Sequence, residues 1–300
     1  MHDPAGKRSQ AIPVQKDTPT YGGLVAGVLA VSSAAVLIRL AEAPPLATAA
    51  WRTGVAALLF IPLAWATHRK ALLGLGGRTW ALLGLSGLGL AAHFAFWIAS
   101  LTYTSVASSV VIVTANPLLV AMASWLFLGE RPGGRVLAGI GVALAGGLVL
   151  AWGDVRLGRR EALGDLLALL GAVAVAVYYI VGRGVRPRLP LLAYIGPVYG
   201  AAALLLTGAS LAMGTPLWGF SGRSVAFLLL VALLPQVAGH SLLNWTLGRL
   251  PAVVVSTAVM AEPVVATGLA WLVLGEEPPL TTLAGGVLIL GGVWWAVRQG

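Results

Sequence analysis

This chain contains two copies of one segment, and the repeat constrains its fold more than any other feature. Residues 126–132 (LFLGERP) return at 272–278 as LVLGEEP, and the same offset of 146 residues pairs Gly146 with Gly292 without a gap. The surrounding sequence is strongly apolar, because 58% of the 300 residues are hydrophobic and 10% are charged, against roughly 25% charged in soluble domains. A repeat in such a chain is typical of a membrane protein that is built from two homologous halves.

Apolar runs separated by proline, glycine and charged residues predict ten membrane-spanning helices. Their predicted limits are 21–41, 46–67, 79–102, 105–128, 134–152, 162–182, 190–211, 225–247, 251–274 and 280–298. Residues 1–20 are predicted to form a disordered cytoplasmic tail, and residues 21–152 and 161–298 are predicted to form two halves of five helices each. Because five is odd, the second half must lie inverted in the membrane relative to the first. The predicted fold is an all-α polytopic membrane protein made of two inverted five-helix repeats.

The net charge of +9 does not indicate a nucleic-acid partner, because the basic residues lie in short segments between the predicted helices. With the N-terminus inside, thirteen Lys and Arg residues fall on the inner side and five on the outer side. The positive-inside rule therefore predicts that both termini are cytoplasmic. The chain contains no cysteine and no zinc, P-loop or dinucleotide motif. We therefore expect no cofactor, no metal and no enzymatic activity.

Polar side chains inside predicted spans are costly and are candidates for function. His93 and His240 fall near the middle of the third and eighth predicted spans, at equivalent positions of the two halves if one insertion is allowed. Trp97 follows His93 by four residues, and Gln236 and Asn244 flank His240 at the same spacing, so each set is predicted to share one helix face. Such groups either join helices through hydrogen bonds or line a cavity. Their occurrence in both halves favours a cavity.

The fourth and ninth predicted spans carry Asn116-Pro117 and Glu262-Pro263 at equivalent positions. Each proline removes a backbone hydrogen bond, so both helices are predicted to kink near the membrane midplane, where Pro117 and Pro263 are candidate hinges. Glu262 is the only acidic residue well inside a predicted span. It is a candidate for binding a substrate amine or for carrying a proton, and the alternative is a neutral carboxyl that bonds to a neighbouring helix.

Three other residues are interpreted as features of the membrane interface. Arg52 lies towards the outer end of the second predicted span and is expected to extend its charge to the surface. Tyr178 and Tyr179 lie close to the inner end of the sixth span and are expected to belong to an aromatic belt, with a pocket wall as the alternative.

The sequence Gly84-Leu85-Ser86-Gly87 matches the GxSG pattern of intramembrane serine proteases, with His240 as a nominal base. Glycine is abundant throughout this chain, however, and a short motif without its structural context is weak. A repeated chain also gives no reason for a one-sided catalytic dyad. We therefore interpret the match as chance or close packing.

The matching segments from Pro117 to Arg131 and from Glu262 to Glu276, each followed by a glycine-rich helix, resemble the EamA family of the drug/metabolite transporter superfamily over residues 21–298. The resemblance implies two inverted five-helix repeats around a central cavity that is lined mainly by helices 1, 3, 4, 6, 8 and 9. In this sequence the implied cavity residues are His93, Trp97, Asn116, Gln236, His240, Asn244 and Glu262. Among the family, the chain looks most like the exporters of amino acids and metabolites, including aromatic amino acids.

The sequence therefore predicts a secondary transporter of the bacterial inner membrane that exports small amphipathic metabolites, with amino acids favoured, by alternating access. Its partners are a small-molecule substrate and the lipid bilayer. An uncoupled facilitator, a carrier of purines, sugars, drugs or lipid-linked sugars, and a scaffold or receptor without transport stay open as alternatives. Coupling to protons is also open, and the glycine-rich helix faces suit internal packing in a monomer or a homodimer interface.

Overall fold

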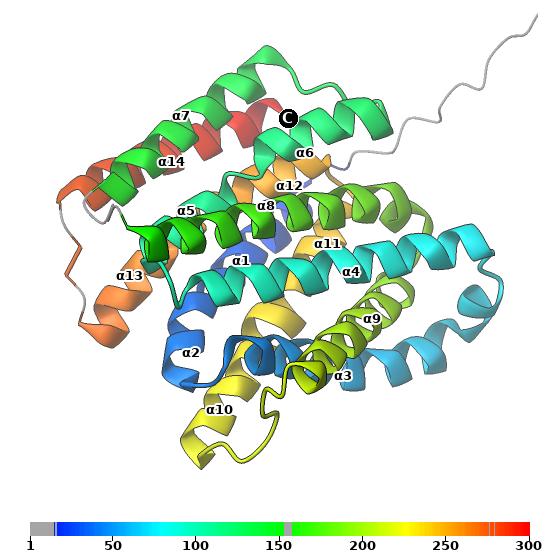
Figure 1. Cartoon of the computed structure of the whole chain (residues 1–300). Helices are drawn as coiled ribbons and strands as arrows, with labels where there is room; N and C mark the ends of the chain where they lie inside the picture. The colour runs from blue at the N-terminus through cyan, green and yellow to red at the C-terminus, as the bar shows by residue number, and fades with distance from the viewer. Residues whose placement is uncertain (1–14, 16, 153–157, 276, 279) are drawn as a thin grey trace, which may run out of the picture.

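The computed structural model describes residues 15, 17–152, 158–275, 277–278 and 280–300, and this part of the chain folds into helices without strands (Figure 1). Ten segments are long and apolar enough to cross a membrane: Thr18–Ala41, Pro45–Leu73, Gly77–Ser100, Ser108–Leu128, Gly134–Ala151, Arg159–Arg188, Leu191–Ala212, Gly222–Leu247, Ala252–Leu274 and Leu280–Gln299. The ten predicted spans are thus confirmed. Residues 1–14 and 16 of the predicted tail lie outside the described residues.

Six of the spans run mainly as one helix each. These helices are α3 (Pro45–Leu73), α4 (Gly77–Ser100), α7 (Gly134–Ala151), α8 (Arg159–Val185, followed by the 3-10 turn η3, Arg186–Arg188), α9 (Leu191–Ala212) and α14 (Leu280–Gln299). The second and sixth spans each continue six residues past their predicted ends, to Leu73 and Arg188. Charge alone does not end a span, because the exposed Arg69 and Lys70 of the second span reach water. In the sixth span Arg183 and Arg186 are instead buried and bonded within the protein.

The other four spans are interrupted. They consist of α1 (Thr18–Ser32) with α2 (Ala34–Ala41), α5 (Val106–Thr114) with α6 (Pro117–Ala123) and the π-helix η1 (Ser124–Leu128), α10 (Gly222–Val231) with the π-helix η4 (Ala232–His240) and α11 (Ser241–Leu247), and α12 (Ala252–Val259) with α13 (Glu262–Leu274). Helix α1 begins three residues before the predicted start, because Asp17 caps it by accepting a hydrogen bond from the backbone N–H of Thr20 at 2.9 Å.

The fourth and ninth spans break where the two prolines predict. Helix α5 stops at Thr114 and α6 starts at Pro117, while α12 stops at Val259 and α13 starts at Glu262, directly before Pro263. In the first break the Asn116 side-chain amide donates to the Val113 carbonyl oxygen at 2.9 Å, and this is the carbonyl that a proline at position 117 leaves without its helical partner. The predicted kinks are present in both helices, whereas their role as hinges stays a prediction.

Helices α7 and α14 are equivalent in the repeat, and they pack side by side in opposite directions (Figure 1). A methyl group added at Gly139 would lie 2.8 Å from the carbonyl oxygen of Gly292, and one added at Gly285 would lie 2.5 Å from that of Gly146. Residue numbers therefore rise along one helix as they fall along the other. This arrangement is the one that an inverted repeat requires. The glycine-rich faces of these helices serve internal packing.

The other contacts between the halves obey the same symmetry. Helix α3 of the second span packs on α9 of the seventh, its equivalent. Helix α4 of the third span packs on α8 of the sixth, while α1 of the first packs on η4 and α11 of the eighth. These reciprocal pairs bring the first, third, sixth and eighth spans to the centre of the molecule, where the fourth and ninth spans, which carry Pro117 and Pro263, join them.

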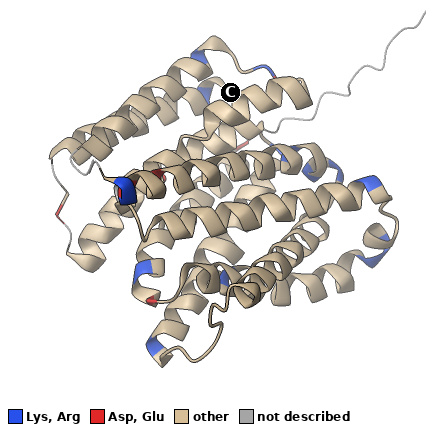
Figure 2. Cartoon of the chain, in the orientation of Figure 1, with Lys and Arg blue, Asp and Glu red and all other residues tan. Residues whose placement is uncertain are grey.

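The outer surface of the bundle is suited to lipid. Large apolar side chains such as Leu58, Phe127 and Leu204 are between 76% and 79% exposed, and a surface of this kind is favourable only in contact with an apolar phase. Figure 2 shows that charged residues of the described chain gather mainly at the ends of the helices. The protein is therefore a multi-pass integral membrane protein.

Candidate functional site

A small cavity lies where the central spans of the two halves meet. Its wall contains eight polar or aromatic side chains, and the remainder is mainly aliphatic. The eight are Arg52, His93, Trp97, Thr114, Asn116, Tyr179, His240 and Glu262. The space open to the centre of a water molecule is about 30 Å³, which holds one or two waters and is too small for an organic metabolite. The cavity is thus closed around its polar groups in this conformation.

Five of the seven residues predicted to form the site line this one cavity, namely His93, Trp97, Asn116, His240 and Glu262. Gln236 and Asn244 do not line it. The expected single stripe on the eighth span is divided. Residues 232–240 form the π-helix η4, whose wider turn changes the angle between Gln236 and His240 from the one that a helical wheel at 3.6 residues per turn gives. Asn244 lies in the α-helix α11, and its side-chain amide donates to the Tyr178 hydroxyl.

The two histidines contact the cavity in different ways. The His93 ring stacks on the Trp97 indole, with 5.8 Å between ring centres and 3° between planes, and its Nδ1 atom lies 3.0 Å from the Gly171 carbonyl oxygen. His93 therefore also joins α4 to α8, as the alternative interpretation of these groups predicted. His240 meets the Phe94 ring edge-on at 5.3 Å, and its buried Nδ1 atom has no hydrogen-bond partner in the described chain.

Arg52 corrects the prediction from sequence. Its side chain does not reach the surface but is 1% exposed, and it lines the cavity. The guanidinium Nε donates to Oε1 of Gln236 at 2.9 Å, and the guanidinium carbon lies 3.9 Å above the Phe94 ring. Arg52 lies seven residues after Pro45, where α3 begins, or roughly 10 Å along the helix at 1.5 Å per residue. That depth is the signal in the sequence against a surface position, although depth alone does not tell which face of α3 carries Arg52.

Tyr178 and Tyr179 are also internal, so their assignment to an interfacial belt is wrong. They are 1% and 3% exposed, and Tyr179 lines the cavity. The Asn244 side-chain amide donates to the hydroxyl oxygens of Tyr178 and of Tyr199, the latter at 3.3 Å. The pocket wall that was the alternative interpretation is therefore observed for Tyr179, whereas Tyr178 is buried behind it and does not line the cavity.

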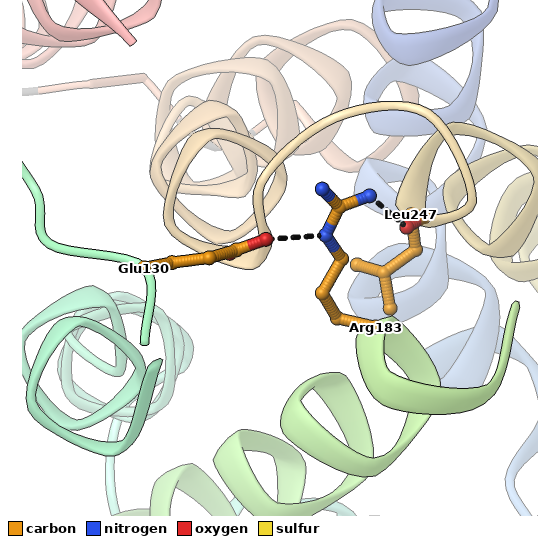
Figure 3. Close-up of polar contacts among 3 residues, drawn as sticks. All are labelled: Glu130, Arg183 and Leu247. Carbon is orange, nitrogen blue, oxygen red and sulfur yellow. Dashed lines mark hydrogen bonds and ion pairs between the residues drawn. The ribbon is translucent and has the colours of Figure 1, made fainter. Parts of the chain in front are cut away.

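An ion pair joins the two halves at the end of the bundle that is predicted to face the cytoplasm (Figure 3). Nε of Arg183, at the end of α8, lies 2.7 Å from Oε1 of Glu130, and Nη1 of the same arginine donates to the Leu247 carbonyl oxygen at 3.3 Å. The Arg183 side chain is fully buried and that of Glu130 is 21% exposed. Glu130 belongs to the first half, whereas Arg183 and Leu247 belong to the second. We call these three residues the inner latch.

A larger hollow of about 830 Å³ lies between α4, α6, η1 and α8. It is a less suitable site, because its wall is mostly aliphatic and includes Met122 and Phe127, which are 55% and 76% exposed on the outer surface of the bundle. A substrate pocket combines an enclosed shape with a few convergent polar groups, and the central cavity has both.

The serine of the GxSG sequence has no place in a catalytic arrangement. Ser86 is fully buried, and its hydroxyl lies 2.6 Å from the hydroxyl of Tyr194. Among the described residues no hydrogen bond joins it to His240. The interpretation as close helix packing agrees with this geometry.

Comparison with known proteins places these features in context. A profile described as the EamA-like transporter family matches residues 19–152 and again residues 162–298. An "Uncharacterized transporter" of Archaeoglobus fulgidus is 25% identical over 86% of this chain and 90% of its own length. A "Probable terminal-alkyne amino-acid exporter" of Streptantibioticus cattleyicolor is 27% identical over 63% of each chain. One crystal structure, 22% identical, has the same fold, with a TM-score of 0.78 over 95% of this chain and 99% of the other.

Proposed function

Because the chain belongs to the EamA-like transporter family, we propose that it exports small amphipathic metabolites, and amino acids in particular, by alternating access. One observation carries this proposal. The buried polar groups of both halves converge on a single closed cavity at the centre of an inverted repeat. In transporters of this architecture the substrate site lies between the repeats, near the midplane.

The chemistry of the cavity favours amino acids over other metabolites. His93, Trp97 and Tyr179 offer aromatic surface for an apolar side chain, and Glu262 offers a carboxyl for an ammonium group. The Streptantibioticus relative, named as a probable exporter of an amino acid, supports this choice of substrate.

The proposed motion is a rocking of the two repeats about the cavity. The breaks at Pro117 and Pro263 divide the two spans that carry Asn116 and Glu262, so the halves of each span can tilt against each other. The inner latch joins the two repeats at one end. It must open before the cavity can exchange with that side.

We further propose that the protein lies in the bacterial inner membrane with both termini in the cytoplasm. Thirteen basic residues on the inner side against five on the outer side support this orientation. The latch then closes the cytoplasmic side, and export requires substrate to enter through it.

Counterflow in proteoliposomes tests the proposed function. Purified protein is reconstituted with an unlabelled amino acid inside, and the entry of the same labelled amino acid is followed over a panel of amino acids. We expect counterflow of at least one, and its loss in the double variant His93→Ala/His240→Ala. The matched control is His68→Ala, at the far end of α3 from the cavity, which should retain the wild-type rate.

Two other results of this assay would change the proposed function. A folded protein that moves no amino acid would refute the proposal and direct the search to purines, sugars, drugs and lipid-linked sugars. Counterflow without accumulation against a concentration gradient, under any imposed ion gradient, would identify an uncoupled facilitator.

A further inference from the structure

Buried polar atoms without partners cluster around the central cavity. In the described chain, Nη1 of Arg52, Nε1 of Trp97, Oδ1 of Asn116 and Nδ1 of His240 are buried and accept or donate no hydrogen bond. All four residues line the cavity. Native proteins leave few buried polar groups unpaired, because each one costs the free energy of desolvation without return. A group of them around one cavity therefore points to a ligand that completes their bonds.

Arg52 is the strongest of these groups. Gln236 binds its Nε atom and the Phe94 ring supports its plane, so the guanidinium is fixed while its Nη1 edge remains available. A fixed guanidinium with free N–H groups matches a carboxylate in charge and in geometry. The indole N–H of Trp97 is a second unpaired donor in a residue that lines the same cavity.

The same cavity also offers acceptors. Oδ1 of Asn116 is unpaired, and Glu262 occupies the position equivalent to Asn116 in the other half, so the two repeats contribute one acceptor each. An ammonium group has three donors and no acceptor. The cavity thus carries one cationic group and one carboxyl, and a ligand with one negative and one positive end matches both.

We propose that Arg52 and Trp97 bind the carboxylate of the substrate while Glu262 and Asn116 bind its ammonium group, so that the protein selects free zwitterionic α-amino acids. This inference rests on the proposed function and makes it specific, because it assigns to Arg52 the recognition of the carboxylate. The substrate side chain then lies against His93 and Tyr179. In the closed conformation, Arg52 and Glu262 share a cavity with room for one or two waters, and the two halves must separate to admit the amino acid between them.

The test compares an amino acid with its own methyl ester, which keeps the ammonium and the side chain but lacks the negative charge. Competition of each compound against labelled amino acid is measured in the counterflow assay. For the wild type we expect the ester to compete about 10- to 100-fold more weakly, the factor that corresponds to losing charged hydrogen bonds. In Arg52→Gln the free acid should compete only a few-fold better than the ester, because the variant loses affinity for the acid. Arg223→Gln, at the start of α10, is the matched control and should keep the full preference.

The outcomes separate this inference from the proposed function. If the wild type moves no amino acid, the proposed function fails and the inference fails with it. If the wild type moves amino acids but accepts acid and ester equally, or if Arg52→Gln keeps the full preference for the acid, the function stands and the role of Arg52 is refuted. Should Arg52→Gln not fold, Arg52→Lys retains the charge without the guanidinium fork and should show a reduced preference, and an unchanged preference there also refutes the role.

Discussion

The inner latch allows a quantitative prediction about gating. We consider Glu130→Gln, which keeps the length of the side chain and one oxygen acceptor but removes its charge. In the closed conformation the change weakens the bond to Arg183, which is 2.7 Å long and lies at the boundary between the two repeats (Figure 3). In a conformation open to the predicted cytoplasmic side the two groups are apart, so the change there has little effect. The substitution should therefore favour opening.

The expected size follows from the burial of the pair. A hydrogen bond to a charged group contributes about 1.5–3 kcal/mol, and exposed ion pairs contribute about 0–1 kcal/mol. Arg183 is fully buried but Glu130 is 21% exposed, and glutamine retains part of the bond. We therefore expect the closed conformation to lose about 1–2 kcal/mol of stability relative to the open one. This loss raises the ratio of open to closed protein roughly 5- to 30-fold.

Distances between spin labels measure this ratio. The chain has no cysteine, so nitroxides attached to Phe127→Cys and Arg188→Cys, which are exposed side chains at the latch end of η1 and η3, report the separation of the repeats without background. Glu130→Gln should increase the population at longer distances. Glu161→Gln, at the opposite end of α8, is the control and should match the parent. Identical distance distributions for the parent and Glu130→Gln would refute the latch.

Three further predictions concern packing, coupling and hinges. Gly285→Ala places a methyl group 2.5 Å from two backbone atoms of α7, so it should lower the free energy of unfolding by about 1–3 kcal/mol. Gly291→Ala, where the methyl group meets open space, is the control. Equal melting temperatures for the two variants would contradict the α7–α14 packing. If Glu262 carries the coupling proton as well as binding the ammonium group, Glu262→Gln should abolish accumulation against a gradient and spare downhill flux at saturating substrate, and unchanged accumulation driven by a proton gradient would disprove that role. Pro117→Ala restores a backbone donor at the break between α5 and α6, so it should slow counterflow several-fold with little change in affinity, and an unaltered rate would remove this break from the mechanism.

The sequence predicted the spans and the repeat because each depends on one strong signal. A helix must cross the hydrocarbon with about 20 apolar residues, and the offset of 146 residues aligned the two halves without a gap over their most similar part. The same offset placed Pro117 and Pro263 at equivalent positions, where each proline predicted a break in its helix. These features follow from local composition and require no knowledge of which helices are neighbours.

The composition of the site depended on those neighbours, and there the predictions were partly wrong. The position of Arg52 along its span was known, but only the packing of α3 on α9 and η4 turns its side chain inwards. Tyr178 and Tyr179 were assigned to the interface for the same reason, since distance along a helix does not tell which face is covered. The π-helix η4, which contains Gln236, has no signature in the hydrophobic pattern, apart from Pro235 within it.

Alternating access requires that one cavity is reached in turn from both faces of the membrane. Val113 lies on the cavity wall and is 4% exposed, so a single Val113→Cys in the naturally cysteine-free chain is a direct reporter. Its reaction with a membrane-impermeant maleimide is measured in right-side-out and in inverted vesicles, with and without a transported amino acid. Alternating access predicts that Val113→Cys is labelled from both faces and that the amino acid slows the labelling in each case. Labelling from one face only, in a variant that still transports, would contradict it.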